Sequence, residues 1–136
     1  KEFPLKTFPA SDHKEIVVNN IGFIGLIALR DPLRKGVKEA IQTAKEAGIR
    51  TIIVTGDHML TASAVAEELS IDGGKECAIE GRELETLSDE NLAKRLEHIK
   101  VYARVEPSHK MRIIEAWQAK GEIIAMTGDG INDALR

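Results

Sequence analysis

The chain has 136 residues, of which 43% are hydrophobic and 30% charged, and its formal net charge is −3. The length suits one compact domain, and the apolar content is too high for a disordered chain. A single cysteine, Cys77, excludes an internal disulfide and a cysteine-rich zinc site. The mildly acidic balance gives no general attraction to nucleic acid. We therefore expect one soluble domain from a reducing compartment, with no nucleic-acid partner.

The first twenty residues differ in composition from the rest of the chain. Residues 1–20 carry two prolines, scattered charge and a single short apolar run at 16–18. We interpret them as a linker or the tail of a preceding unit, and residues 21–136 as the domain itself. The longest apolar stretch, Ile21–Leu29, is interrupted by two glycines and is far shorter than the ~20 residues that span a bilayer.

From residue 21 onward, short apolar runs alternate with helical patterns. The runs that predict strands are 21–29, 51–54, 77–79, 100–103 and 123–126, and the helical patterns cover 36–47, 59–69, 89–96 and 107–120. Ser88 or Asp89 is expected to cap the third helix, and Pro107 takes a favoured place in the first turn of the fourth. Strands that alternate with helices form βαβ units around a parallel sheet, so the predicted fold class is α/β.

One short pattern occurs twice, each time at the predicted end of a strand. Thr, Gly and Asp follow the run 51–54 as Thr55–Asp57 and follow the run 123–126 as Thr127–Asp129. Ligands of open α/β sheets bind at this carboxyl edge. Threonine hydroxyls and glycine amides can donate to phosphate oxygens, and a carboxylate can hold Mg²⁺. One copy could equally be a turn that begins a helix, but two copies at one edge favour a phosphate site.

The second copy extends into a dense polar loop. Asp129, Asn132 and Asp133 place two carboxylates and an amide within five residues, and repulsion between the carboxylates favours a bound cation. Lys110 lies on the first turn of the helix predicted at 107–120, where its ammonium could neutralise a phosphate. Taken alone, such a lysine would be an ordinary surface residue.

Other polar residues give weaker signals. The four histidines show no metal-ligand spacing, and His58 is expected to begin a helix at the surface. Residues 82–100 mix both signs of charge at helical spacing, which is typical of a solvated helix. These residues therefore add no further candidate site.

Taken together, the motifs resemble those of P-type ion-pumping ATPases, which belong to the haloacid dehalogenase-like superfamily. Thr127–Asp133 resembles the hinge motif of this family, Thr55–Asp57 its Thr-Gly-Asp motif and Asp31–Arg34 its Asp-Pro-x-Arg motif. Ala103–Lys110 is similar to the lysine segment of calcium pumps of the sarcoplasmic/endoplasmic reticulum kind. The similarity covers residues 21–133 with every motif in the family's order, which makes the signal specific.

The resemblance implies a magnesium and phosphoryl-transfer site. Asp129 would ligate Mg²⁺ beside a phosphorylated aspartate, and Asp133 would support that site. Asn132 and Lys110 would contact the transferring phosphoryl group and spread its charge. Such roles suit phosphoryl transfer, in which positioning and charge neutralisation supply most of the catalysis. The residues implied as catalytic are therefore Lys110, Asp129 and Asp133.

The resemblance also implies a nucleotide site, with ATP as the phosphoryl donor. Thr55 and Gly56 would line the phosphate, and Asp57 would contribute to the environment of the nucleotide and Mg²⁺. Arg104 would lie near the ribose. The Asp-Pro-x-Arg segment is expected to order a hinge rather than to take part in the chemistry.

The chain departs from the family at one decisive point. The sequence Asp-Lys-Thr-Gly-Thr, whose aspartate the family phosphorylates, does not occur in it. In the family fold this motif follows a strand that lies between the two strands ending in Thr-Gly-Asp. We therefore predict a Rossmann-like, haloacid dehalogenase-type parallel sheet with helices on both faces that lacks its first, central strand. Residues 21–136 would be an incomplete phosphorylation domain, and residues 1–20 a linker or the tail of the preceding nucleotide-binding domain.

The leading hypothesis is therefore a part of an ATP-driven cation pump, with Ca²⁺ as the favoured ion, at the cytoplasmic face of a membrane. Its partners would be ATP, the remaining pump domains and the transported cation, reached through a membrane domain outside this sequence. The chain alone is expected to be inactive.

Two alternatives to the cation pump stay open. One is a soluble haloacid dehalogenase-like phosphatase, for which only Asp12 precedes residue 21 as a nucleophile. The other is a non-catalytic α/β module that binds Mg²⁺ and phosphate.

Overall fold

The structure is a computed structural model that describes residues 25, 27, 29, 31–71 and 74–128. The chain divides into two units, 1–32 and 33–136, and the fold described below belongs to the second. Within the described ranges, no helix has the length and apolar composition needed to cross a lipid bilayer. The predicted boundary after residue 20 lies outside these ranges and stays a prediction.

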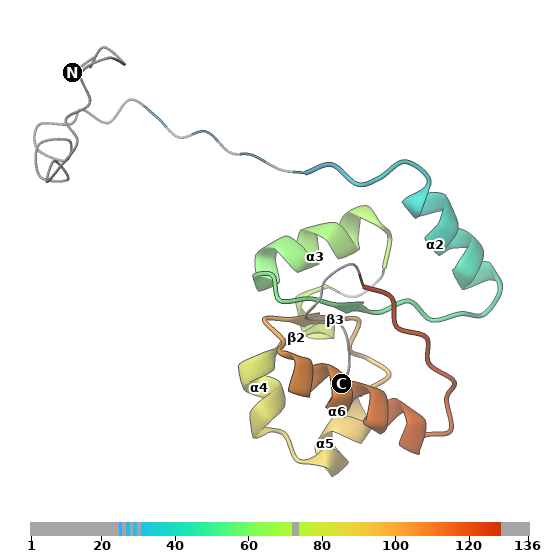
Figure 1. Cartoon of the computed structure of the whole chain (residues 1–136), viewed down its shortest axis with the longest axis vertical. Helices are drawn as coiled ribbons and strands as arrows, with labels where there is room; N and C mark the ends of the chain where they lie inside the picture. Colours follow the sequence, from blue (N-terminus) through green and yellow to red (C-terminus); the bar gives the residue numbers. More distant parts are fainter. Residues whose placement is uncertain (1–24, 26, 28, 30, 72–73, 129–136) are drawn as a thin grey trace, which may run out of the picture. The chain divides into compact units, whose positions relative to one another are not determined.

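Three short parallel strands form the sheet (Figure 1). β1 (Ile53–Val54) and β2 (Ala78–Glu80) both pair with β3 (Val101–Ala103), so β3 lies at the centre in the order β1-β3-β2. Three of the predicted strands are thereby confirmed, each shortened or shifted by one or two residues.

Four of the six described helices follow the predicted patterns closely. The six are α2 (Val37–Glu46), α3 (Met59–Glu68), the 3₁₀ helix η1 (Lys75–Cys77), α4 (Gly81–Thr86), α5 (Asp89–Arg95) and α6 (Pro107–Ala119). Ser88 caps α5, because its Oγ accepts a hydrogen bond from the backbone N of Asn91 at 3.3 Å. Pro107 is the first residue of α6, as predicted. Neither η1 nor α4 was predicted, because both are too short to show a helical period in the sequence.

Helices cover both faces of the sheet, which confirms that part of the prediction. On one face, Ala62 and Ala66 of α3 pack against Val101 and Ala103 of β3. Successive side chains of a strand point to opposite faces, so Tyr102 lies on the other side. There α4, α5 and α6 supply a larger core around Tyr102, which includes Ile79, Leu84, Leu92, Leu96, Ile99, Ile113 and Trp117.

Two predicted strands do not appear in the described part of the chain. The strand predicted at 123–126 is wrong, since these residues have no regular secondary structure. Of the strand predicted at 21–29, the structure describes Gly25, Ile27 and Leu29, and none of the three lies in a strand. A strand needs a neighbour for its backbone hydrogen bonds. In the family that the sequence resembles, the strand that leads to Asp-Lys-Thr-Gly-Thr would be the neighbour of this run, and that motif does not occur in these 136 residues.

Gly81 lies where two segments of the chain come very close. It is the buried first residue of α4, directly after β2, and a Cβ atom there would collide with the carbonyl oxygen of Arg104. The same Cβ would lie 3.0 Å from Nδ1 of His109. A residue without a side chain is therefore required at this position.

We expect Gly81→Ala to destabilise the protein by about 1–3 kcal/mol, because a collision with backbone cannot be relieved by a change of rotamer. Urea unfolding followed by circular dichroism measures the loss. Gly56→Ala is a matched control, since a Cβ there would have only an ordinary contact, at 3.9 Å from the carbonyl oxygen of Val105. Equal losses in the two variants would contradict the prediction.

Tyr102 generates a second prediction. Its side chain is 0% exposed, and its hydroxyl has no hydrogen-bond partner among the described residues. Burial raises the pKa of Tyr102, since the charged phenolate would lose its hydration. The folded state therefore holds this proton more tightly than the unfolded chain does. It consequently loses stability as the pH rises above the ordinary tyrosine pKa of about 10.

We expect Tyr102→Phe to leave the free energy of unfolding at pH 7 unchanged or to raise it by up to about 1 kcal/mol, because no hydrogen bond is lost. The midpoint of alkaline unfolding should move to higher pH in the variant. Urea midpoints at pH 7 and unfolding curves in alkaline buffer test both expectations. A clear loss of stability at pH 7 would mean that the hydroxyl is hydrogen-bonded.

Candidate functional site

The loops that follow β1 and β3 are joined to each other by backbone hydrogen bonds. The backbone N of Arg104 donates to the carbonyl oxygen of Asp57 at 3.0 Å. The backbone N of Val105 donates to the carbonyl oxygen of Thr55 at 3.1 Å. Both loops leave the carboxyl ends of parallel strands. The first Thr-Gly-Asp motif and the segment Ala103–Lys110 therefore lie side by side at one sheet edge, as the sequence predicts.

The Thr-Gly-Asp loop is a tight turn with an open backbone. Oγ1 of Thr55 accepts a hydrogen bond from the backbone N of Asp57 at 3.1 Å. Gly56 is exposed and has nothing closer than 3.9 Å to the place of a Cβ, so a ligand could approach its backbone. The carboxylate-bearing Asp57 is also exposed. The loop thus offers a hydroxyl, an accessible backbone and a carboxylate.

His58 follows this loop and begins α3. Its Nδ1 accepts a hydrogen bond from the backbone N of Leu60 at 3.2 Å, so the imidazole serves as the N-cap of the helix. The prediction of a surface residue at a helix start is confirmed.

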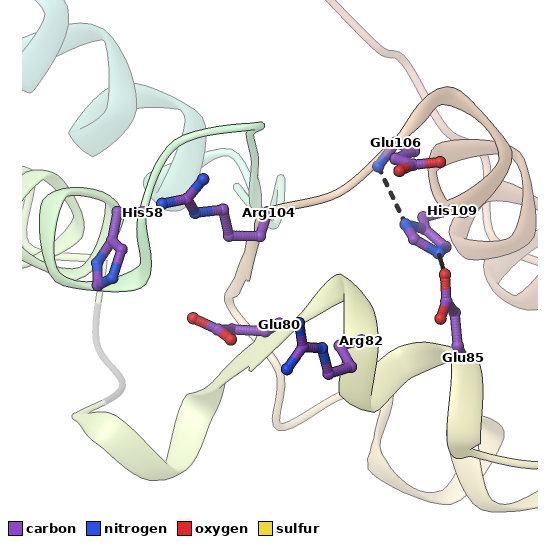
Figure 2. Close-up of a pocket in the computed structure, with 7 residues that line it drawn as sticks. All are labelled: His58, Glu80, Arg82, Glu85, Arg104, Glu106 and His109. Atoms are coloured by element: carbon purple, nitrogen blue, oxygen red, sulfur yellow. Dashed lines mark hydrogen bonds and ion pairs between the residues drawn. The ribbon is translucent and has the colours of Figure 1, made fainter.

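Arg104 has an unusual backbone conformation for a residue with a side chain. Its φ is +52°, in the left-handed region. Such a conformation costs of order 1 kcal/mol and persists only where neighbouring contacts impose it. Here the hydrogen bond to Asp57 and the close packing of its carbonyl oxygen against Gly81 hold the residue. As a result, the arginine leaves the end of β3 towards the side where His58 lies (Figure 2).

A polar hollow of about 440 Å³ lies at this edge (Figure 2). It is lined by His58, Glu80, Arg82, Glu85, Arg104, Glu106 and His109. The side chains of Arg82 and Arg104 make no hydrogen bond or ion pair with another residue of the described ranges, whereas Glu85 is bonded to His109. Guanidinium groups bind phosphate through paired hydrogen bonds. The two guanidinium groups could therefore bind an anionic group, although the carboxylates of Glu80, Glu85 and Glu106 line the same hollow.

His109 joins α6 to α4 at one side of the hollow. Its Nδ1 accepts a hydrogen bond from the backbone N of Glu106 at 3.0 Å, so the ring hydrogen is on Nε2. Nε2 in turn donates to Oε1 of Glu85, also at 3.0 Å. The Glu106 side chain accepts from the backbone N of His109, which completes a capping box at the start of α6.

The remaining predicted site residues divide into two groups. Lys110 lies on the first turn of α6 and is half-buried, so its predicted place is confirmed. Asp129, Asn132 and Asp133 lie outside the described residues, and their roles stay predictions. Among the residues that the structure describes, no three histidine, cysteine, aspartate or glutamate side chains gather closely enough to hold a metal ion.

Reasoning from the sequence missed part of the hollow. The charge pattern predicts that Arg82 and Glu85 lie on a solvated helix, and His109 shows no metal-ligand spacing. A weak signal existed, since His109 follows Glu106 by three residues, which is the spacing of a capping box. Nothing in the local sequence indicates that Glu85 and His109 meet.

Comparison with known proteins gives matches over almost the whole chain. The family model described as haloacid dehalogenase-like hydrolase matches residues 3–135. A calcium-transporting ATPase of Listeria monocytogenes is 48% identical over 123 residues, which cover 90% of this chain and 13% of that protein. Calcium-transporting ATPase 1 of Lactococcus lactis is 46% identical over 130 residues, which cover 93% of this chain and 15% of that protein. The human calcium-transporting ATPase type 2C member 2 is 41% identical over 118 residues, which cover 87% of this chain and 12% of that protein.

The chain thus spans only 12–15% of the length of these relatives. The parallel α/β sheet, the motif loops tied together at its carboxyl edge and the match over residues 3–135 agree with one another. This chain belongs to the haloacid dehalogenase-like hydrolases, and relatives that are 41–49% identical to it over most of its length are named calcium-transporting ATPases.

Proposed function

We propose that this chain is part of the phosphorylation domain of an ATP-driven cation pump that transports Ca²⁺. The pump would couple ATP hydrolysis to transport through an aspartyl-phosphate intermediate, with this domain at the cytoplasmic face of a membrane. The observation that carries the proposal is the hydrogen-bonded pair of loops at the sheet edge, Thr55–Asp57 and the segment that begins at Arg104. The relatives named calcium-transporting ATPases support the choice of ion.

The charges at the sheet edge support a phosphoryl-transfer role. Arg104 and Lys110 both come from the segment after β3, and their positive charges would neutralise the phosphates of ATP and the transferring group. Thr55 uses a lone pair of Oγ1 to accept from Asp57, which leaves its own O–H as a donor to a phosphate oxygen. The exposed backbone of Gly56 would approach the same phosphate.

Asp129 and Asp133 would hold Mg²⁺ in this proposal, and Asn132 would contact the phosphoryl group. Carboxylate oxygens are the ligands that Mg²⁺ prefers. The described part of the edge supplies cations and single carboxylates but no cluster that could hold a metal ion, so the donor set would come from the hinge motif. When bound, the ion supplies positive charge to the phosphoryl oxygens.

The phosphorylated aspartate would come from a strand outside this sequence. β1 pairs with β3 on one side, and no strand of the described ranges pairs with its other edge. The apolar run at 123–126 has no strand partner either. A strand between them would use the backbone groups of β1 and give residues 123–126 a neighbour. Without that strand, the 136-residue chain would have no nucleophile.

We expect the full-length protein that carries this sequence to form an acid-stable phosphoenzyme from ATP in a Ca²⁺-dependent reaction. Asp129→Asn should lower the rate of phosphoenzyme formation by about 100-fold or more, because it removes a charged ligand of Mg²⁺. Acid quenching after incubation with γ-labelled ATP measures this. Gln42→Ala is the control, since Gln42 is exposed on α2 and bonds only within that helix, to Glu46.

Other outcomes of this experiment would favour the alternatives. Hydrolysis of small phosphate esters without a phosphoenzyme derived from ATP would indicate a phosphatase. Binding of Mg²⁺ and a phosphate mimic without any turnover would indicate a non-catalytic module.

The 136-residue chain alone should form no acid-stable phosphoenzyme under the same conditions, because it contains no Asp-Lys-Thr-Gly-Thr aspartate. The full-length protein run in parallel is the positive control. Label that is retained by the isolated chain after acid quenching, and released by hydroxylamine, would contradict the proposal of a nucleophile outside this sequence.

A further inference from the structure

The imidazole of His109 is bonded at both nitrogens, and the two partners belong to different elements. The side chain is only 10% exposed, and a buried polar ring is costly unless its nitrogens are hydrogen-bonded. The backbone N of Glu106, just before α6, donates to Nδ1, and the carboxylate of Glu85 on α4 accepts from Nε2. The ring cannot turn without breaking both hydrogen bonds.

The ring also packs against backbone. A Cβ on Gly81 would lie 3.0 Å from Nδ1 and 3.1 Å from Cε1 of His109, and it would collide with the carbonyl oxygen of Arg104. The end of β3, the start of α4 and the start of α6 therefore meet around one imidazole. Figure 2 shows His109 between Glu106 and Glu85, beside the hollow.

Capping of α6 does not by itself require this arrangement. A capping box needs one acceptor at the third helical position, and Glu or Gln usually supplies it. Here Nδ1 alone fills that role. The second hydrogen bond, from Nε2 to Glu85, is not part of the capping box: it keeps the ring hydrogen on Nε2 and fixes the ring relative to another helix.

We propose that His109 is a positioning residue for Lys110. The inference rests on the proposed function, in which Lys110 contacts the transferring phosphoryl group. Successive residues of an α-helix are rotated by about 100° around its axis, so the direction in which Lys110 leaves α6 follows from that of His109. The hydrogen bond between His109 and Glu85 fixes how the first turn of α6 is rotated about the helix axis. That rotation sets the direction of the Lys110 side chain. A misplacement of about 1 Å in a catalytic group can cost 100-fold in rate.

The proposal can be tested because α4 and α6 are also held together elsewhere. Arg112, one turn further along α6, donates to the carbonyl oxygen of Leu84 at 2.6 Å and also bonds the carbonyl oxygen of Leu87 and the carboxylate of Asp89. Loss of the link between His109 and Glu85 should therefore leave the two helices packed and affect only the first turn of α6, which lies before Arg112.

Three variants of the full-length protein separate positioning from capping. His109→Asn keeps a hydrogen-bond acceptor near the position of Nδ1 but loses the bond to Glu85. Glu85→Ala removes the same bond by removing the acceptor. Glu85→Gln keeps an acceptor oxygen for Nε2 of His109. We expect the first two to slow phosphoenzyme formation at saturating ATP by about 10–100-fold, with the KM for ATP changed far less. Glu85→Gln should restore most of the rate. Ser88→Ala, which weakens the cap of α5, is the control and should leave the rate unchanged.

A double-mutant cycle with Lys110→Ala tests whether His109 acts through the lysine. If it does, His109→Asn slows the reaction in the wild-type background and has no further effect in the Lys110→Ala background. Additive effects would overturn the inference. It would also be overturned if Ser88→Ala lowered the rate as much as Glu85→Ala, because the losses would then reflect general destabilisation.

A second readout separates this inference from the proposed function. Acylation of lysines in the full-length protein, followed by mass spectrometry, reports the surroundings of Lys110 whether or not a phosphoenzyme forms. We expect His109→Asn to change the acylation rate of Lys110 and to leave that of Lys94, which pairs with Glu90 on α5, unchanged. An absent phosphoenzyme in the wild type would refute the proposed function alone. An unchanged rate at Lys110 would refute the positioning role.

Discussion

The pairing of β3 with both of its neighbours is the constraint on which the candidate site depends. Because β3 is central, its carboxyl end emerges between the loop after β1 and the start of α4. Arg104, the first residue after the strand, is consequently bonded to Asp57 on one side and packed against Gly81 on the other. Making both contacts requires the unfavourable left-handed backbone conformation of Arg104.

This arrangement gathers positive charge at the sheet edge. Arg82 and Arg104 line the hollow, and Lys110 follows on the first turn of α6. Three carboxylates also line the hollow: Glu85 accepts from His109, Glu106 caps α6, and Glu80 lies at the end of β2. The described part of the edge could therefore bind a phosphate-bearing ligand through its cationic side chains. The metal ligands would have to come from the hinge motif that follows residue 126.

Prediction from the sequence succeeded where a segment carries its own periodicity. The helices α3 and α6 have apolar faces repeated over several turns, and β3 is a short apolar run between turn residues, so each was found within one or two residues. The six residues of α4 are too few for a period, and this helix was missed. The apolar run at 123–126 has the pattern of a buried strand, but a strand also needs a neighbour for its backbone hydrogen bonds, and none of the described strands pairs with it.

The sequence by itself determined the local elements, the residue types at the sheet edge and the order of the motifs, because each of these depends on neighbours a few positions away. Only the tertiary structure decided that Glu85 reaches His109 across 24 residues and that Gly81 faces Arg104. Those contacts follow from the order of the strands and the packing of α4 against α6. Contacts between distant segments produce no periodic pattern in the sequence. The hydrogen bonds that hold His109 between Glu106 and Glu85 are therefore evident only in the tertiary structure.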